Sequence, residues 1–542
     1  MGSSLEDVPV NPYSRLAILL ALAPLAFLSL PLLLVFAPAL LAAYAFLIAL
    51  QMFAPARLPP SLQETSFLMS SAAAATTGIR LAREKLFGNS KVATKEPAIT
   101  RGLSPSPVPR RAFDRTDASI TDIAKLEVAG QYEKLQDTLR TLIRDDPKRT
   151  FAHPAVKAWL GRRWRNLLLQ YAADDPVAVA EATTREYLGL LDDSRPVAQR
   201  LAEQFFKLPL TAGPQEWQYV PGSGGGVTPL PEAGPLPDLS ESPTMMLFIP
   251  GIITGMLPVR EFNPSMPNVQ KACGMKMLRA AVHPLRGSAA NLPDVLAALE
   301  QGKGFHADLS ETPADAKAYS PKSVIVIAYS KGMTDLLEFL IAYPEWQDKV
   351  KCVFSWAGVV GGSPLADNMY GSIRNWDIDK MVQRLDEVLE WICPLVNLLK
   401  GTALKRLEEV DIKDAIKSIT IEHRQAWMAK HADALKEMKV PILCITASCL
   451  AHECAYFNAS GWMLLNMHDS NNDMQVTQGA ALIDTPLTTH LAILHANHWD
   501  ISFGSFPHPH MTLGSRKLVH PFPKEAALTA MISLADELGL LA

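Results

Sequence analysis

The sequence has no excess of positive charge. Its 51 Lys and Arg residues are outnumbered by 55 Asp and Glu, and the net charge is −4. No basic stripe runs along the chain, so the electrostatic attraction that dominates nucleic-acid binding is missing. The glycine-rich stretch 357–367 also lacks the Gly-Lys-Ser/Thr ending of a phosphate loop. We therefore expect no nucleic-acid partner and no nucleotide cofactor.

Cysteine is scarce and scattered, with six residues in 542. None of them has the spacing of a metal site, and most stand inside apolar runs such as 442–445, which predicts buried thiols. Cys449 and Cys454 are close enough in sequence to pair in an oxidising compartment. We expect no metal and no other cofactor.

Charge is absent altogether from Leu16 to Leu50, and the apolar character continues to Phe53. Such a run exceeds the 7–15 residues of a secretory apolar region, so it predicts a membrane element. Pro24, Pro31 and Pro38 interrupt it at even spacing, and proline kinks a helix. A hairpin that dips into one leaflet, loosely similar to the proline knot of lipid-droplet proteins, and a single kinked span both remain open. We expect a membrane location, with an endomembrane or a lipid droplet as candidates.

Composition divides the rest of the chain. Apolar residues at helical spacing, such as Leu135, Leu139 and Leu142, predict a helical domain, and a Gly- and Pro-rich linker follows it. The predicted segments are a polar N-terminus (1–15), a membrane anchor or hairpin (16–53), an amphipathic helix and linker (54–114), a helical domain (115–210), a linker (211–243) and a C-terminal domain (244–542).

The most informative stretch is 324–335. Its first six residues, Val-Ile-Val-Ile-Ala-Tyr, predict a strand buried on both faces, and apolar residues recur at helical spacing after Gly332. Strand, sharp turn and helix with Ser330 at the apex is the pattern of a nucleophile elbow, although an ordinary Ser-Gly turn is the alternative. Small residues are required two positions before and two after the serine, and here they are Ala328 and Gly332.

With this elbow, residues 244–542 resemble the α/β-hydrolase superfamily, its lipases and esterases in particular. The resemblance implies an α/β fold in which a mostly parallel sheet is flanked by helices. It also implies that the helical insertion at 368–439 is a lid, although a helical cap that only packs on the sheet is the alternative. The resemblance does not extend to residues 1–240.

The superfamily places its catalytic residues in the chain order Ser, Asp, His. The stretch 472–476 looks like the superfamily's Asn-Asp-Gly-x-Val loop, with Met474 in place of the glycine. The resemblance therefore implies Asp473 as the acid, and Asp469 and Asp484 are alternatives. It implies His498 as the general base, because this residue follows the last predicted strand at 491–494. His495 is the alternative base.

The predicted strand at 245–249 ends in Pro250-Gly251-Ile252. The resemblance implies that the backbone N–H groups of Ile252 and Lys331 form an oxyanion hole, although a plain Pro-Gly turn is the alternative. The pattern further predicts a strand at 280–282, a helix at 293–300, a strand at 350–356 and a final helix at 524–541.

These residues predict a membrane-associated serine hydrolase that cleaves esters, of lipids in particular, through an acyl-enzyme. Thioesters, or acyl transfer to an acceptor other than water, would use the same triad. The alternative is a catalytically silent protein of this fold that acts as a lipid-surface or scaffold protein, and Ala328 and Met474 support it.

Overall fold

The computed structural model describes residues 115–173, 205–206, 232–252, 259–313, 320–375, 406, 409–454, 459–504 and 522–541. All of them belong to the larger of the two units into which the chain divides. The predicted membrane element at 16–53 and the segment 54–114 lie outside the described residues. None of the helices that the structure describes is long and apolar enough to cross a membrane.

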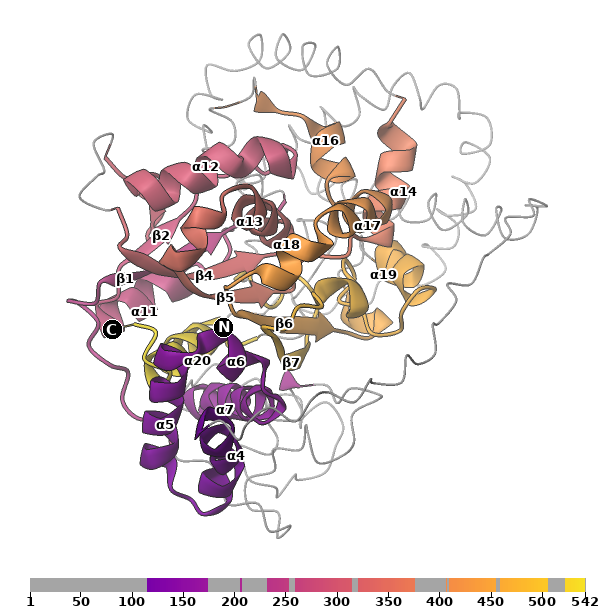
Figure 1. Ribbon diagram of the computed structural model, residues 1–542. Helices are drawn as coiled ribbons and strands as arrows, with labels where there is room; N and C mark the ends of the chain where they lie inside the picture. Colours follow the sequence, from indigo (N-terminus) through magenta and orange to yellow (C-terminus); the bar gives the residue numbers. More distant parts are fainter. Residues whose placement is uncertain are drawn as a thin grey trace, which may run out of the picture. The chain divides into compact units, whose positions relative to one another are not determined.

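A sheet in the strand order β3-β2-β1-β4-β5-β6-β7 organises the described residues (Figure 1). All neighbouring strands pair in parallel except β3, which is antiparallel to β2. The fold is therefore of the predicted α/β class. The strands are β1 (Thr244–Ile249), β2 (Met277–Arg279), β3 (Phe305–His306), β4 (Ser323–Tyr329), β5 (Val350–Trp356), β6 (Ile442–Ser448) and β7 (Thr488–His495).

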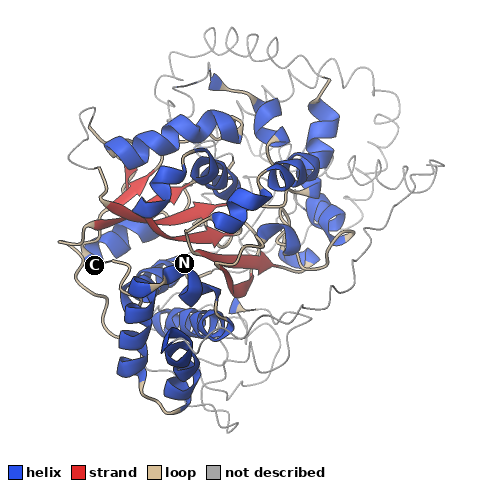
Figure 2. Ribbon diagram, viewed as in Figure 1, coloured by secondary structure: helices blue, strands red, loops and turns tan. Residues whose placement is uncertain are grey.

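Alternating side chains of the central strands enter two different cores. In β4, Val324 and Val326 join the cluster on one face, whereas Ile325 and Ile327 join the cluster on the other. This is why the strand reads as a continuous β-branched run, since both of its faces are covered by helices. Figure 2 shows the strands between two layers of helices.

Helices α12 (Ser288–Gln301), α13 (Lys331–Ala342) and α18 (Ala432–Glu437) contribute to the first core. Helices α7 (Pro154–Ala173), α11 (Ser265–Cys273) and α20 (Lys524–Glu537) contribute to the second. The segment between β5 and β6 carries α14 (Pro364–Ile373), α16 (Ile412–Lys417) and α17 (Ile421–Lys430), while 376–405 of the predicted lid lies outside the described residues.

The predicted helical domain packs directly on the sheet. It contains α4 (Arg115–Val128), α5 (Tyr132–Asp145), α6 (Pro147–Ala152) and α7. Arg165 of α7 donates to the backbone oxygen of Leu491 in β7 at 2.5 Å, and the Trp164 ring meets Trp356 of β5 edge to face at 6.4 Å. The buried Arg163 forms an ion pair with the partly exposed Glu537 of α20. These helices thus share one hydrophobic core with the sheet, and the predicted domain boundaries stay a prediction.

Several predicted bounds differ from the structure, and the last strand, predicted at 491–494, is β7 at Thr488–His495. The strand expected at 280–282 is β2 at Met277–Arg279, where it pairs with β1. The prediction was wrong because the charged Arg279 at the end of β2 does not fit the pattern of a buried strand. Helix α12 begins at Ser288, and Pro293 lies in its interior instead of at its start. The final helix ends at Glu537, four residues before the predicted end.

Candidate active site

Ser330 lies at the apex of the turn between β4 and α13. Its backbone has φ 54° and ψ −125°, a combination that non-glycine residues rarely adopt. Its N–H donates to the oxygen of Trp356 at 3.1 Å, and its own carbonyl accepts from the N–H of Val359 at 3.1 Å. The sharp strand-to-helix turn predicted around this serine is present, and strand β5 and the loop after it stabilise the strained backbone.

The small residues around Ser330 are required by close backbone contacts. A Cβ added to Gly332 would lie 2.3 Å from the carbonyl oxygen of Ile249 and 2.6 Å from that of Pro250. A Cβ added to Gly251 would lie 2.8 Å from the Cβ of Ser330. The turn after β1 and the elbow after β4 therefore touch, as the predicted oxyanion hole requires.

Alanine at position 328 is compatible with the elbow. Its side chain is fully buried in the core that contains α12 and α13, and its backbone pairs with Ile249 on one side and Ser355 on the other. The methyl group fits between strand and helix, so this departure from glycine does not distort the turn.

The loop that carries Asp473 is held by its own hydrogen bonds. One oxygen of the Asp473 carboxylate, Oδ1, accepts from the backbone N–H groups of Gln475 at 3.0 Å and Val476 at 2.7 Å. Met474, in the position of the usual glycine, adopts φ 74° and is fully buried. The left-handed turn is thus kept despite the missing glycine, and packing of the methionine side chain accompanies the strained backbone.

His498 contacts this loop twice. Its Nδ1 lies 2.6 Å from the carboxylate oxygen Oδ2 of Asp473. Its backbone N–H donates to the backbone carbonyl oxygen of Asp473 at 2.9 Å. Both side chains are almost fully buried. A carboxylate on Nδ1 fixes the ring orientation and leaves Nε2 as the nitrogen that can accept a proton.

Tyr329 connects this pair to the elbow. Its ring stacks on the His498 imidazole with the centroids 5.0 Å apart, and its hydroxyl donates to the backbone oxygen of His498 at 2.8 Å. Burial raises the pKa of Tyr329 well above its ordinary value, so the phenol stays neutral. Because Tyr329 directly precedes Ser330, these contacts bring the imidazole to the elbow.

No hydrogen bond joins the side chains of His498 and Ser330. Among the described residues, His498 Nε2 has no hydrogen-bond partner. Such catalytic hydrogen bonds are often long before substrate binds. The catalytic roles of Ser330, Asp473 and His498 stay predictions.

The alternative candidates have other partners. Asp469 accepts from the backbone N–H groups of Asn471 at 2.9 Å and Gly479 at 3.4 Å, so it stabilises the loop itself. Asp484 is exposed to solvent. His495 places Nε2 3.1 Å from Oε1 of Glu453, a carboxylate that the sequence did not single out.

The two predicted oxyanion donors lie at the switch point of the sheet. Ile252 follows β1, Lys331 follows β4, and the chain leaves these neighbouring strands toward opposite edges of the sheet. Ligands of open α/β sheets bind at such a crevice, beyond the carboxyl ends of the strands. As the first residue of α13, Lys331 has an N–H without a carbonyl partner inside the helix.

A cavity of about 140 Å³ adjoins this turn at the ends of β1 and β2. Pro250, Glu261, Arg279 and His283 are among its lining residues. Burial lowers the pKa of Arg279 to about 10, and the nearby Glu261 partly opposes this shift. The guanidinium remains charged at neutral pH, so one of the side chains that line the cavity carries a positive charge.

Sequence reasoning missed the partners of the elbow. Tyr329 occupies a position of the motif that accepts many residue types, so no pattern marked it. The ion pair of Lys331 with Asp335 could have been predicted from the sequence, because opposite charges four residues apart share one face of a helix.

Comparisons with known proteins identify similar structures only. No protein-family model matches the chain, and no curated protein matches its sequence. The structure is similar to a metagenomic carboxyl esterase, at 18% identity over 69% of this chain and 91% of that one, with a TM-score of 0.45. It is similar to a Bacillus licheniformis lipase in its mature form, at 18% identity over 56% and 96%, with a TM-score of 0.34. A lipase-esterase related protein from Clostridium acetobutylicum matches at 16% identity over 38% and 76%, with a TM-score of 0.20.

Proposed function

We propose that the chain is a serine hydrolase of the α/β-hydrolase type that cleaves carboxylic esters. The observation that carries the proposal is the buried 2.6 Å contact between His498 and Asp473, which is joined through Tyr329 to a strained serine turn. A stability role alone gives no reason to collect a strained serine, an oriented imidazole and a buried carboxylate at one point.

In the proposed reaction, His498 Nε2 takes the hydroxyl proton as Ser330 Oγ attacks the ester carbonyl. Asp473 orients the ring and stabilises the imidazolium that forms. The N–H groups of Ile252 and Lys331 donate to the developing oxyanion, the alcohol leaves with the proton from His498, and water then releases the acyl group from Ser330.

The proposed substrates are lipid esters, and the proposed location is a membrane or lipid-droplet surface. The support is the uncharged stretch from Leu16 to Leu50, because an enzyme held at an interface meets water-insoluble esters directly. Extraction of the full chain from membranes by detergent, but not by high salt or carbonate, tests the location. Release into the salt or carbonate wash would contradict it.

A fluorophosphonate probe tests the activity, because it labels only an activated serine. We expect labelling of the wild-type protein in detergent and its loss in Ser330→Ala and in His498→Ala. Ser372→Ala is the matched control, since this serine lies in α14 and its hydroxyl donates to the backbone oxygen of Asn368 in the same helix. A folded wild type that stays unlabelled with detergent and with lipid would favour the catalytically silent protein instead.

A further inference from the structure

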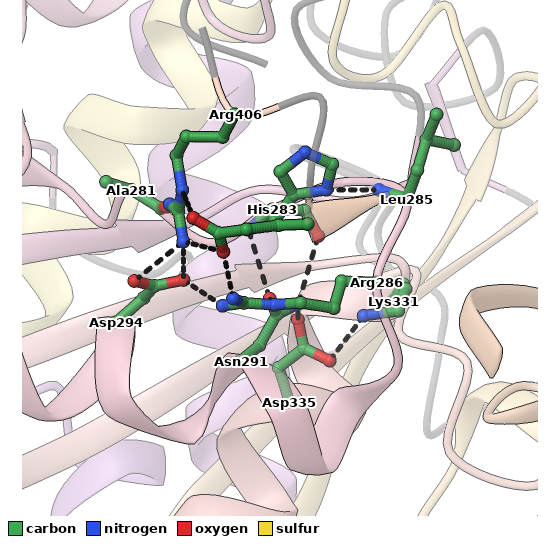
Figure 3. Close-up of polar contacts among 10 residues, drawn as sticks. Ala281, His283, Leu285, Arg286, Asn291, Asp294, Lys331, Asp335 and Arg406 are labelled. Atoms are coloured by element: carbon green, nitrogen blue, oxygen red, sulfur yellow. Dashed lines mark hydrogen bonds and ion pairs between the residues drawn. The ribbon is translucent and has the colours of Figure 1, made fainter. Parts of the chain in front are cut away.

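A chain of buried polar side chains begins directly after Ser330 (Figure 3). Lys331 extends its ammonium group along α13 to Asp335, where Nζ and Oδ1 lie 2.7 Å apart. Each of the two side chains is only 1% exposed. The second oxygen of Asp335 accepts from Nδ2 of Asn291 on α12 at 2.8 Å.

Asn291 uses both ends of its amide. Its Nδ2 also donates to the backbone oxygen of His283 at 3.1 Å. Its Oδ1 accepts from the N–H of His283 at 3.0 Å and from Nε of Arg286 at 3.1 Å. The side chain therefore fixes α12, the loop after β2 and α13 to one another, and neither a carboxylate nor an apolar side chain can make the same bonds.

Arg286 continues the chain toward the predicted lid segment. Its guanidinium forms ion pairs with Asp294 and with Glu409. Arg406 binds the same two carboxylates and donates to the backbone oxygen of Ala281 at 2.8 Å. The outer part of the chain thus contains two arginines and two carboxylates, and its charges balance.

Stability does not explain the inner ion pair. A cation near the N-terminus of a helix opposes the helix dipole, and a buried pair recovers little more than the desolvation of its two ions. The pair has a different consequence, because it holds the side chain of the residue whose backbone N–H is the predicted second oxyanion donor.

We propose that Asn291 and Asp335 are positioning residues for the N–H of Lys331. Asp335 holds the Lys331 side chain under the first turn of α13, and Asn291 holds Asp335. The peptide between Ser330 and Lys331 then keeps the orientation in which its N–H points to the developing negative charge. This inference rests on the proposed hydrolase function, because it assigns a role within that oxyanion hole.

The direct test compares Asn291→Leu and Asp335→Asn with wild type on p-nitrophenyl butyrate. We expect kcat to fall at least tenfold while KM changes less than twofold, because the donor acts on the transition state and not on the bound ester. We also expect faster hydrogen exchange in the peptide that covers residues 329–333. Glu338→Gln is the matched control: it removes a buried carboxylate from the same helix, bonded to Arg424 and not to Asn291 or Lys331, and should leave kcat unchanged.

A double variant separates positioning from folding. Lys331→Met with Asp335→Asn removes both charges of the pair and keeps an acceptor for Asn291, so the fold should persist with little change in Tm. Its kcat should nevertheless fall as in the single variants. Wild-type kcat and elbow exchange in this variant would overturn the inference, as would single variants that lose no more kcat than Glu338→Gln.

Failure of the proposed function has a different signature. A wild type with neither ester turnover nor labelling of Ser330 rejects the hydrolase, and with it the oxyanion role of the Lys331 N–H. An active wild type whose network variants keep kcat and elbow exchange rejects the positioning role alone.

Discussion

The carboxylate of Asp473 accepts from two backbone N–H groups through one oxygen and lies 2.6 Å from Nδ1 of His498 through the other. The bonds from the two N–H groups orient the carboxylate, and the contact with Nδ1 orients the imidazole. Asp473 therefore connects the geometry of its own loop to the orientation of the proposed base.

Replacing this carboxylate by an amide tests the pair. In Asp473→Asn, we expect kcat to fall by about 10⁴-fold, because the amide favours the wrong imidazole tautomer and cannot stabilise the charged ring. The fold should persist, since Asn keeps an acceptor for the two N–H groups. Steady-state kinetics with p-nitrophenyl butyrate gives the answer, and Asp469→Asn is the matched control. An equal loss of kcat in both variants would contradict the assignment of Asp473.

The contact of Gly332 with Ile249 predicts a steric effect. Gly332→Ala places a methyl group 2.3 Å from the backbone oxygen of Ile249, so the backbone must shift to accept it. We expect a loss of about 3 kcal/mol or more in the free energy of unfolding, measured by urea denaturation. The control is Gly371→Ala in α14, where nothing lies within 4 Å, and which should stabilise by up to about 1 kcal/mol. Equal stability of the two variants would show that the elbow relaxes.

Glu338 predicts a pH dependence of stability. Burial raises its pKa from 4.5 to about 7, although its ion pair with Arg424 opposes the shift, and burial also lowers the pKa of Arg424. The folded state then binds more protons than the unfolded state between pH 4.5 and 7. The contribution of this group is fully present below pH 4.5 and is lost as the pH rises through 7.

Urea denaturation across this pH range measures the effect. We expect Glu338 to lower the free energy of unfolding by up to about 1.4 kcal/mol per pH unit between pH 4.5 and 7. Glu338→Gln should remove this component, so the difference between variant and wild type changes with pH. A difference that stays constant from pH 4.5 to 7 would mean that the pKa is not raised.

The thiols of Cys449 and Cys454 predict a disulfide under oxidation. Both thiols are free and buried, and their Sγ atoms lie 3.5 Å apart. A small movement would bring them to the S–S distance of roughly 2.05 Å in a disulfide. Diamide should remove two hydrogen atoms from this pair, and the small loop should stabilise the fold by about 2 kcal/mol. The hydrogen bond with Cys454 and, after it, burial raise the pKa of Cys449, so the reaction should accelerate with increasing pH.

Peptide mapping after alkylation detects the crosslink, and Cys449→Ser is the control. A crosslink that forms only in urea would show that the folded chain holds the two thiols apart from the oxidant. Because the N–H of Cys449 donates to the oxygen of Asn472, ester turnover before and after oxidation also reports on the Asp473 loop.

Local pattern was sufficient for the central strand β4 and for the turn that follows it. The β-branched run of β4 indicated a strand covered on both faces, since only such a strand has no polar alternation. Gly332 indicated a close contact, and the structure supplies its partner in Ile249. The bounds of β2 were missed, because Arg279 in its last position is a charged residue whose burial no local pattern reveals.

The sequence by itself determined the α/β class, the position of the serine turn and the order in which an acid and a histidine follow it. These are properties of residue type and spacing along the chain. Only the tertiary structure decided which acid meets which histidine, because Asp473 and His498 are separated by 24 residues and compete with Asp469, Asp484 and His495. It also decided that Asp335, which pairs with Lys331 on the same helix, accepts from Asn291 on α12. Contacts of this kind depend on how helices and loops pack across a sheet, and no spacing along the chain encodes that packing.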